Sequence, residues 1–554
     1  MTAGTLGAAI DACLGDYFDR YPQYAARLGL HDYDGRVTDL SPEALDEWPA
    51  RARGHMRRLA ALDDTGLDAD ARLDRDALVM AMEHEVFACE VLGAYRRDPM
   101  DVVNLVDVSG YLKRDYAPLA DRAAGLRRHL AEVPRVLQEA RMSLRLPAPA
   151  PLVDTAVGLL EGVERFLAED LVAAVEPLKE EAPGLVDEVR AARDVAGEAV
   201  AAHLAFLAGL SEGGNTVAAF AIGEAAFRTQ LRTQEGVTTD LDRLAEMGRA
   251  DLARNTAALE SVARAIEADA DPRRVIADLA ADHPPAKELV AVTEGMLAEL
   301  RGWLEDQGLV TVPPGGRLLV APTPPFLRWA FAMMDAPGAF EAETAEAYYY
   351  ITLPNPDWPK EEQAQWLTKF ARGSLRDVSI HEAYPGHYVQ NLHLRRVPGR
   401  VRRVFASYAT IEGWAHYSEQ LVIEAGYRPE DLALRLAQLG EAILRDVRLL
   451  AAIEMHARGL GVAEAEGMFQ DLAHMAPAAA RAEAVRGTFD SGYGSYALGK
   501  WMLLKLRHDY KRAAKETEAG FSLRRFHDDF LALGAPPMPL VRGALLGTES
   551  GDVL

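Results

Sequence analysis

The first 305 residues show a helical pattern almost without interruption, and this feature restricts the possible fold more than any other. Ala, Leu, Arg and Glu dominate this part, and Pro and Gly mark its turns. Apolar residues that return every three or four positions form one stripe on a helix, which predicts a buried face. Two such stripes are Leu289, Val292, Met296, Leu300, Trp303, and Leu432, Leu436, Leu439, Ile443, Val447, Leu450.

The pattern changes between about residues 308 and 356. The runs 318–320 and 347–353 are rich in aliphatic, aromatic and β-branched residues, so they are the strand candidates of a small sheet near 316–353. An edge strand can bind an extended peptide through its main chain, although a structural hairpin without a ligand fits the sequence equally well. We therefore expect a mainly α fold with a helical region at 1–305 and a second region at 306–554 that carries the small sheet, the metal-binding helices and the C-terminal helices, the two regions joined as one continuous bilobed unit.

The overall charge and the cysteine content exclude several classes of protein. The 554 residues have a formal net charge of −24, whereas a nucleic-acid-binding surface needs clustered Lys and Arg. Cys13 and Cys89 are the two cysteines, too few for a disulfide framework, which favours a reducing, cytoplasmic compartment. The start of the chain lacks the pattern of a signal peptide, and no uncharged apolar run of eighteen residues predicts a membrane span.

The segment 379–390, Ser-Ile-His-Glu-Ala-Tyr-Pro-Gly-His-Tyr-Val-Gln, places two imidazoles and a carboxylate within seven residues. In the common His-Glu-x-x-His arrangement, two His four positions apart bind zinc and the Glu is the base for metal-bound water. Here His381 and His387 are six apart, which on an unbroken helix would separate them by about 9 Å along the axis. One straight helix could not bring both to one metal.

Pro385 and Gly386 change that expectation. Proline lacks the N–H that would bond to the carbonyl of residue 381, and glycine permits unusual backbone angles. The sequence therefore predicts a break that turns His387 back toward His381, with Glu382 beside them as the general base.

A third metal ligand is expected downstream, in the segment 411–419. Glu412, His416 and Glu419 are spaced by four and three, so they share one helical face. We take Glu412 as the ligand and Glu419 as a residue supporting the site; a solvated helix face is the alternative, which Trp414 and the apolar residues after it disfavour.

These motifs resemble the bacterial domain-of-unknown-function family 885, whose members resemble helical glutamate-type zinc peptidases. The resemblance rests on His-Glu-Ala-x-Pro-Gly-His followed by Glu-Gly-Trp-Ala, and it extends over nearly the whole chain. Further matching blocks are 22–31, 33–35, 448–450 with His456, 495–496 and 499–500. The resemblance implies a large zincin-like fold and one divalent metal, zinc by default, on His381, His387 and Glu412, with Glu382 as base.

Two segments depart from the family pattern. Ala452-Ile-Glu454 stands where Asp-Thr-Gly is expected, and Asp490-Ser-Gly492 stands where Pro-Gly-Gln is expected. The proposed ligands are intact, so these differences point to a specialised substrate pocket.

Other residues are candidates for binding the substrate or stabilising a transition state. An oxyanion needs a donor near the metal, and Tyr496 is the first choice because it lies in a family block; packing in a helical core is its alternative interpretation. Arg486 and Lys500 could hold a substrate carboxylate, and a tyrosine of the 347–353 run could line a cleft. The remaining candidates are His416 and His456 as catalytic donors, and Tyr349 and Tyr493 as substrate contacts.

The sequence thus predicts a metal-dependent hydrolase of a peptide or amide bond. Two alternatives stay open: a metal-dependent hydrolase or lyase acting on a non-peptide small molecule, and an inactive binding protein. Nitrogen and oxygen ligands also accept manganese, cobalt or iron. The substrate and the oligomeric state are not determined by these motifs.

Overall fold

The structure is a computed structural model that describes residues 3–63, 65–324, 331–515, 520–547 and 553–554. By its packing the chain divides into two compact units. Unit 1 comprises residues 1–222 and 338–341, and unit 2 comprises residues 223–337 and 342–554. The sequence boundary expected at residue 305 falls inside unit 2.

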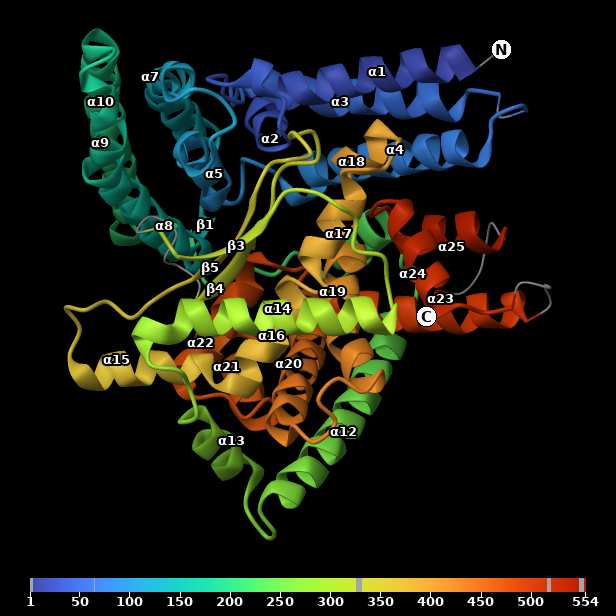
Figure 1. Ribbon diagram of the computed structural model, residues 1–554. Coiled ribbons are helices and arrows are strands. Elements are labelled where there is room, and N and C mark those ends of the chain that lie inside the picture. Colours follow the sequence, from blue (N-terminus) through green and yellow to red (C-terminus); the bar gives the residue numbers. More distant parts are fainter. Residues whose placement is uncertain (1–2, 64, 325–330, 516–519, 548–552) are drawn as a thin grey trace. The chain divides into compact units, whose positions relative to one another are not determined.

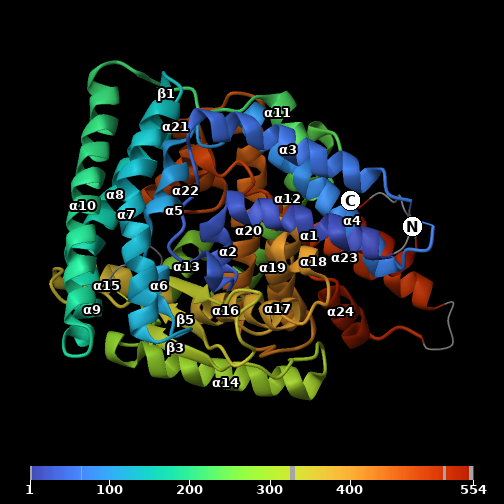
Figure 2. The ribbon, with the colours of Figure 1, turned by 90° about the horizontal axis from the view of Figure 1, so that it is seen from above.

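Unit 1 is built mainly from helices, and Figure 2 shows α7, α8 and α10 lying side by side within it. Its elements are α1 (Ala3–Arg20), α2 (Pro22–Arg27), η1 (His31–Tyr33), α3 (Pro42–Ala60), α4 (Ala69–Phe87), η2 (Ala88–Leu92), η3 (Pro99–Val102), α5 (Val103–Val106), α6 (Gly110–Lys113), α7 (Leu119–Ser143), β1 (Ala148–Pro149), α8 (Ala150–Ala168), α9 (Asp170–Val175), η4 (Glu176–Lys179), α10 (Pro183–Glu212) and β2 (Thr216–Val217). The short strands β1 and β2 pair in parallel.

Within the described residues, α10 is the one helix long and apolar enough to cross a membrane by length and composition. Core helices of soluble proteins pass the same test, so one such helix is weak evidence for a membrane span. Here α10 packs against α7 and α8, and it buries Val189, Val200, Leu207 and Leu210.

Residues 338–341 belong to unit 1 although they lie between two strands of unit 2 in the sequence. The N–H of Phe340 donates to the Leu28 carbonyl at 2.7 Å. His31 lies 3.1 Å from Glu341 and 3.3 Å from Asp34, and its ring stacks on Tyr116 at 3.6 Å. These contacts hold the segment against the N-terminal helices.

Unit 2 contains the remaining helices and a second sheet (Figure 1). Its elements are α11 (Glu224–Gln230), η5 (Leu231–Glu235), α12 (Leu241–Ile266), α13 (Pro272–Ala280), η6 (Ala286–Glu288), α14 (Leu289–Gln307), β3 (Leu318–Pro322), β4 (Ala332–Asp335), β5 (Ala347–Ile351), α15 (Lys360–Leu367), η8 (Thr368–Phe370), α16 (Arg372–Glu382), α17 (His387–Leu394), α18 (Arg400–Val404), α19 (Tyr408–Glu424), α20 (Leu432–Ala457), α21 (Val462–Leu472), α22 (Pro477–Phe489), α23 (Ser495–Ala514), α24 (Leu523–Ala532) and α25 (Met538–Leu546).

The small sheet has the strand order β3-β5-β4. Strand β5 pairs with β3 in parallel and with β4 antiparallel, so β4 is an edge strand. The two predicted strand runs are confirmed as β3 and β5, and Tyr349 faces opposite Tyr348 and Tyr350, whose rings stack. Strand β4 was not predicted, and residues 325–330 within the expected sheet range lie outside the described residues.

The mainly α class is confirmed, and the predicted stripe of α20 lies in the core of unit 2. Five of its six residues, from Leu436 to Leu450, are buried, and Leu432 at the helix start is partly exposed. Helix α20 packs against α12, α16 and α23, while α16 and α23 both pack against α19. The helices that carry the predicted metal ligands therefore belong to one packed core.

Candidate metal centre

The predicted break between the two histidines is present. Helix α16 ends at Glu382 and α17 begins at His387. Gly386 passes so close to the end of α16 that an added Cβ would lie 1.7 Å from the His381 carbonyl oxygen. The indole N–H of Trp414 donates to the Pro385 carbonyl at 2.9 Å, which fixes the turn against α19. The rings of His381 and His387 consequently lie 4.8 Å apart, with their planes perpendicular.

Helix α19 brings Glu412 to the two imidazoles. Its backbone packs closely on α23, because Gly413 and Gly499 face each other and a Cβ on Gly413 would lie 2.4 Å from the carbonyl carbon of Gly499. Glu412 Oε2 lies 3.5 Å from His381 Nε2 and 3.4 Å from His387 Nε2. Within the described part of the chain, these three residues form the one group of His, Cys, Asp or Glu side chains arranged to hold a metal ion.

The donor set fits a divalent cation. Glu412 Oε2 is buried and forms no well-oriented hydrogen bond to a described residue, although both Nε2 atoms lie within 3.5 Å. Burial favours the neutral acid, but His387 and His381 outweigh it and hold the pKa of Glu412 well below its usual range. A carboxylate oxygen and two imidazole nitrogens facing one point are a typical ligand set for zinc and related ions.

Glu419 supports this group from the side away from the ligand atoms. Its Oε1 accepts from His381 Nδ1 at 2.7 Å, and its Oε2 accepts from His416 Nδ1 at 2.9 Å. Burial would raise its pKa, but His416, Arg445 and His381 together lower the pKa of Glu419 well below its usual range. Because the ionised carboxylate accepts a hydrogen bond from Nδ1–H, the lone pair of a neutral His381 ring is on Nε2, the atom that faces Glu412.

Glu382, the predicted general base, directly follows His381 at the end of α16 and contacts strand β4. The N–H of Met334 donates to Glu382 Oε2 at 3.2 Å. Met334 is opposite Tyr349 of β5, so an N–H that bonds to Glu382 points away from β5. The side of β4 that pairs with no strand among the described residues therefore faces the candidate base.

The family described as "Bacterial protein of unknown function (DUF885)" matches residues 22–545 of this chain. The chain belongs to this family. No curated protein matches. Two solved structures share its fold: one described as a putative lipoprotein of unknown function from Shewanella oneidensis, and one described as a putative lipoprotein from Colwellia psychrerythraea.

The fold of these two structures agrees with that of this chain over almost the full length. The Shewanella protein is 20% identical with a TM-score of 0.80, and the alignment covers 98% of this chain and 99% of the other. The Colwellia protein is 17% identical with a TM-score of 0.83, and the alignment covers 98% of each chain. The resemblance at these identities concerns the fold alone, and the cytoplasmic location expected from the cysteines stays a prediction.

In this DUF885 chain Tyr496 lies next to His381, and Arg486 contacts Tyr496. The Tyr496 ring is 6.4 Å from the ring of His381, and its hydroxyl is 3.5 Å from Arg486 Nη2. Tyr408, which the sequence analysis did not single out, accepts from the same Nη2 atom at 3.0 Å. Burial, followed by Tyr496 and Asp490, raises the pKa of Tyr408, so its hydroxyl keeps its proton. Its position four residues before Glu412, on the same helical face, was the available signal.

Two predicted site residues lie behind the ligands, in the core. His416 is enclosed between Glu419 and Lys500, whose Nζ is 3.5 Å from His416 Nε2. Burial and the Lys500 charge lower the pKa of His416 to about 3, so the ring is neutral near pH 7. Lys500 is 2% exposed, and burial lowers its pKa. In this arrangement Lys500 contacts the network behind Glu419, and a substrate carboxylate could not reach it without rearrangement.

The remaining candidates are fully buried. Tyr349 lies on the central strand, with its hydroxyl 3.5 Å from Ser379 Oγ. Tyr493 directs its hydroxyl to Met455 Sδ at 3.8 Å. His456 Nε2 lies 2.7 Å from the Gly487 carbonyl, and its ring stacks on Phe227. These contacts are those of packed core residues, and roles in substrate binding or catalysis stay predictions.

The two segments that depart from the DUF885 pattern lie in different surroundings. Glu454 forms an ion pair with Arg458 within α20 and its C-terminal end. Asp490 instead accepts from Arg486 at 2.9 Å and from the Tyr408 hydroxyl at 3.2 Å. The second departure therefore lies among the residues next to the metal-binding group.

Proposed function

We propose that this DUF885 protein is a metal-dependent hydrolase, with zinc as the default metal, that cleaves a peptide or amide bond on a zincin-like fold. The observation that carries the proposal is the position of Glu412 Oε2, buried without a well-oriented hydrogen bond and within 3.5 Å of two imidazole nitrogens. Glu382 lies next in sequence to one of those histidines. A pure metal-binding site does not require this additional carboxylate.

His381, His387 and Glu412 would hold the cation. A divalent cation bound there would lower the pKa of a water molecule and polarise a carbonyl group. Glu382 would accept a proton from the attacking water and transfer it to the leaving amine. The N–H of Met334 orients the Glu382 carboxylate, and Glu419 keeps the His381 ring in the required tautomer.

Strand β4 supports a peptide as the substrate. The side of β4 that pairs with no described strand carries the N–H that reaches Glu382, so an extended chain bound along this edge would lie alongside the base. Tyr496 remains the first candidate for stabilising an oxyanion, because its ring lies beside His381 and its O–H is a hydrogen-bond donor. The Tyr408 hydroxyl donates to Asp490 and accepts from Arg486, so it would hold Arg486 beside Tyr496 and would not donate to the oxyanion itself.

Metal analysis followed by a hydrolysis assay tests the proposal. The wild type purified without added metal should contain about one equivalent of a divalent metal, as a three-ligand catalytic site requires. His387→Ala and Glu412→Ala should lose most of it, and the wild type should hydrolyse members of a panel of peptides and amides.

The outcomes separate the alternatives. Bound metal in the wild type without cleavage of any peptide or amide would favour a reaction on a non-peptide small molecule or a binding protein. A wild type that neither contains nor takes up a divalent metal would contradict the proposed function.

A further inference from the structure

Arg486 is placed to extend the site beyond the metal-binding group. It lies on α22, and its Nη2 contacts the hydroxyls of Tyr408 and Tyr496 at 3.0 and 3.5 Å. Tyr408 lies one helical turn before Glu412, and the Tyr496 ring is beside His381. The guanidinium group is therefore linked through two tyrosines to two of the three candidate ligands.

The exposure of Arg486 distinguishes it from the other cations near Tyr496. The guanidinium groups of Arg445, Arg448 and Arg486 all lie within 6 Å of the Tyr496 ring, at 5.6, 5.2 and 5.9 Å. The side chains of Arg445 and Arg448 are each only 9% exposed, and Arg448 is held by both carboxylate oxygens of Glu483 at 2.8 Å. The side chain of Arg486 is 30% exposed.

One nitrogen of Arg486 is available for a ligand. Its Nε and Nη2 both donate to the same oxygen of Asp490, at 3.1 and 2.9 Å. No described residue accepts a hydrogen bond from Nη1. Glu382, His387, Glu412 and Tyr408 are partly exposed, as the Arg486 side chain is.

We propose that Arg486 binds a carboxylate group of the substrate next to the bond that is cleaved. Arg486 Nη1 together with the nearby Tyr496 hydroxyl is a suitable set of donors for a carboxylate. Asp490 already places one negative charge at this guanidinium, which disfavours a doubly charged phosphate more than a singly charged carboxylate. Resting on the proposed function, this inference narrows the substrates to peptide-like amides that end in a free carboxylate.

Binding, measured separately from hydrolysis, tests the inference. Acetyl-Ala-Ala with a free carboxylate and the same dipeptide as its C-terminal amide would be titrated into metal-loaded Glu382→Gln protein by calorimetry. The acid should bind about 10- to 100-fold more tightly than the amide, as a charge-assisted hydrogen bond predicts. Arg486→Gln in the same background should reduce the difference to less than about twofold, as expected when that bond is lost.

Two further variants control for indirect effects. Arg486→Gln/Asp490→Asn removes both members of the ion pair. If this double variant also shows no preference for the acid, the loss of preference in Arg486→Gln cannot be attributed to an unpaired Asp490. Arg481→Gln makes the same charge change at an exposed position of α22 and should retain the preference. Metal content and melting temperature would be measured for every variant to exclude misfolding.

The inference is overturned if the acid and the amide bind equally to the Glu382→Gln protein, including the case in which neither binds at millimolar concentration. Retained preference in Arg486→Gln would overturn it as well. Arg486-dependent preference for the acid, together with no hydrolysis by the wild type, would support the carboxylate site while contradicting the proposed function. Hydrolysis of acid and amide substrates at equal rates would support the proposed function while contradicting the carboxylate site.

Discussion

At the scale of single residues, Glu382 is the side chain on which the proposed reaction depends most directly. Glu382→Gln keeps the shape of the side chain but removes the ionised carboxylate that would accept a proton. The rate should fall by about 10²- to 10⁴-fold, the usual contribution of a general base. The metal content should stay that of the wild type, because Glu382 is outside the ligand group.

Measured kcat and metal stoichiometry on the same preparations check this prediction. Glu382→Gln protein that retained full activity would show that another group accepts the proton. Loss of the metal together with activity would instead indicate that Glu382 supports the metal-binding group.

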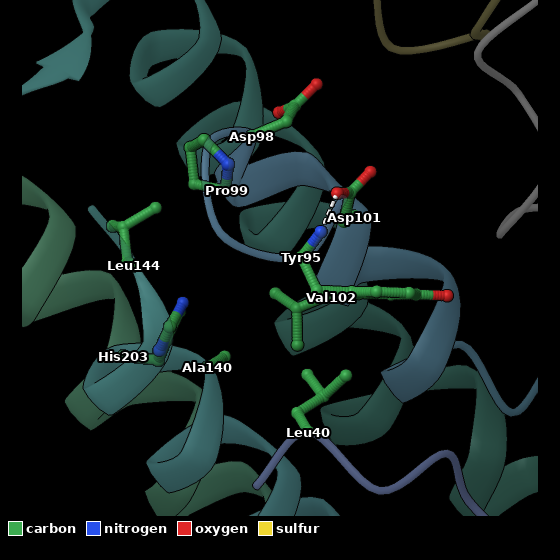
Figure 3. Close-up of a pocket in the computed structure, with 9 residues that line it drawn as sticks. All are labelled: Leu40, Tyr95, Asp98, Pro99, Asp101, Val102, Ala140, Leu144 and His203. Atoms are coloured by element: carbon green, nitrogen blue, oxygen red, sulfur yellow. Dashed lines mark hydrogen bonds between the residues drawn. The ribbon is translucent and has the colours of Figure 1, made fainter. Parts of the chain in front are cut away.

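A second residue-scale prediction concerns Asp101 of unit 1, which lines a small recess with Asp98 and His203 (Figure 3). Its Oδ2 accepts from the N–H of Tyr95 at 2.6 Å, and Tyr95 has a positive φ of 61°. Burial, followed by the Asp98 charge, raises the pKa of Asp101 to about 7. Burial also raises the pKa of Asp98 to about 6, which the Met100 N–H and Arg97 partly oppose.

The sign of the pH dependence follows from this raised pKa. Between the ordinary pKa of an aspartate and pH 7 the folded state binds more protons than the unfolded state, so stability decreases as the pH rises through that range. Asp101→Asn can still accept from Tyr95 and has no charge to bury. It should raise the melting temperature at pH 8 and lose this advantage near pH 4.

Thermal melts from pH 4 to pH 8 check the prediction, with the exposed Asp194→Asn as a control for the charge change. If the difference in melting temperature between Asp101→Asn and wild type did not vary with pH, Asp101 would have the same pKa in the folded and unfolded states.

At the scale of secondary-structure elements, the turn between α16 and α17 determines whether two histidines can share one metal. Gly386→Ala would put a methyl group against the His381 and Ile380 carbonyls, at 1.7 and 2.5 Å from their oxygens. Since backbone atoms cannot yield as a flexible side chain does, the turn must shift and move His387 away from His381. We expect weaker metal binding and a lower melting temperature.

Gly440→Ala is the matched control, because Gly440 lies inside α20 and an added Cβ meets nothing within 4 Å. Replacing a helical glycine by alanine should leave stability unchanged or raise it by about 0.5–1 kcal/mol. Equal metal affinity in Gly386→Ala and wild type, measured by competition with a chelator, would show that the turn tolerates the shift.

The same turn shows what the sequence could predict at this scale. Proline and glycine at 385 and 386 act on the local backbone, so the break could be predicted from these two residues. The shared helical face of Glu412, His416 and Glu419 could be predicted from their spacing. Strand β4 was missed because its sequence, Ala-Met-Met-Asp, has no strong β preference, and pairing with β5 stabilises it instead. Lys500 was assigned to the substrate because its enclosure by α19, α12 and α20 arises from packing between segments distant in the chain.

At the scale of the whole molecule, the candidate metal ligands all belong to unit 2. His381, His387 and Glu412 come from α16, α17 and α19, which pack within that unit, while α7, α8 and α10 pack within unit 1. A ligand that binds only the folded form stabilises it by about 2.7 kcal/mol at a free concentration one hundred times its Kd. Metal binding should therefore suppress local opening first in the elements that supply the ligands.

Amide hydrogen exchange with and without the metal checks this prediction. Removal of the metal by a chelator should accelerate exchange in α16, the 383–386 turn and α19, and exchange in α7 and α10 should change little, because local openings can be independent of one another. In Glu412→Ala the same treatment should have no effect. If chelation accelerated exchange to the same degree in α7 and α10, the metal would be stabilising the chain as one cooperative whole, and the division into separately opening units would be wrong.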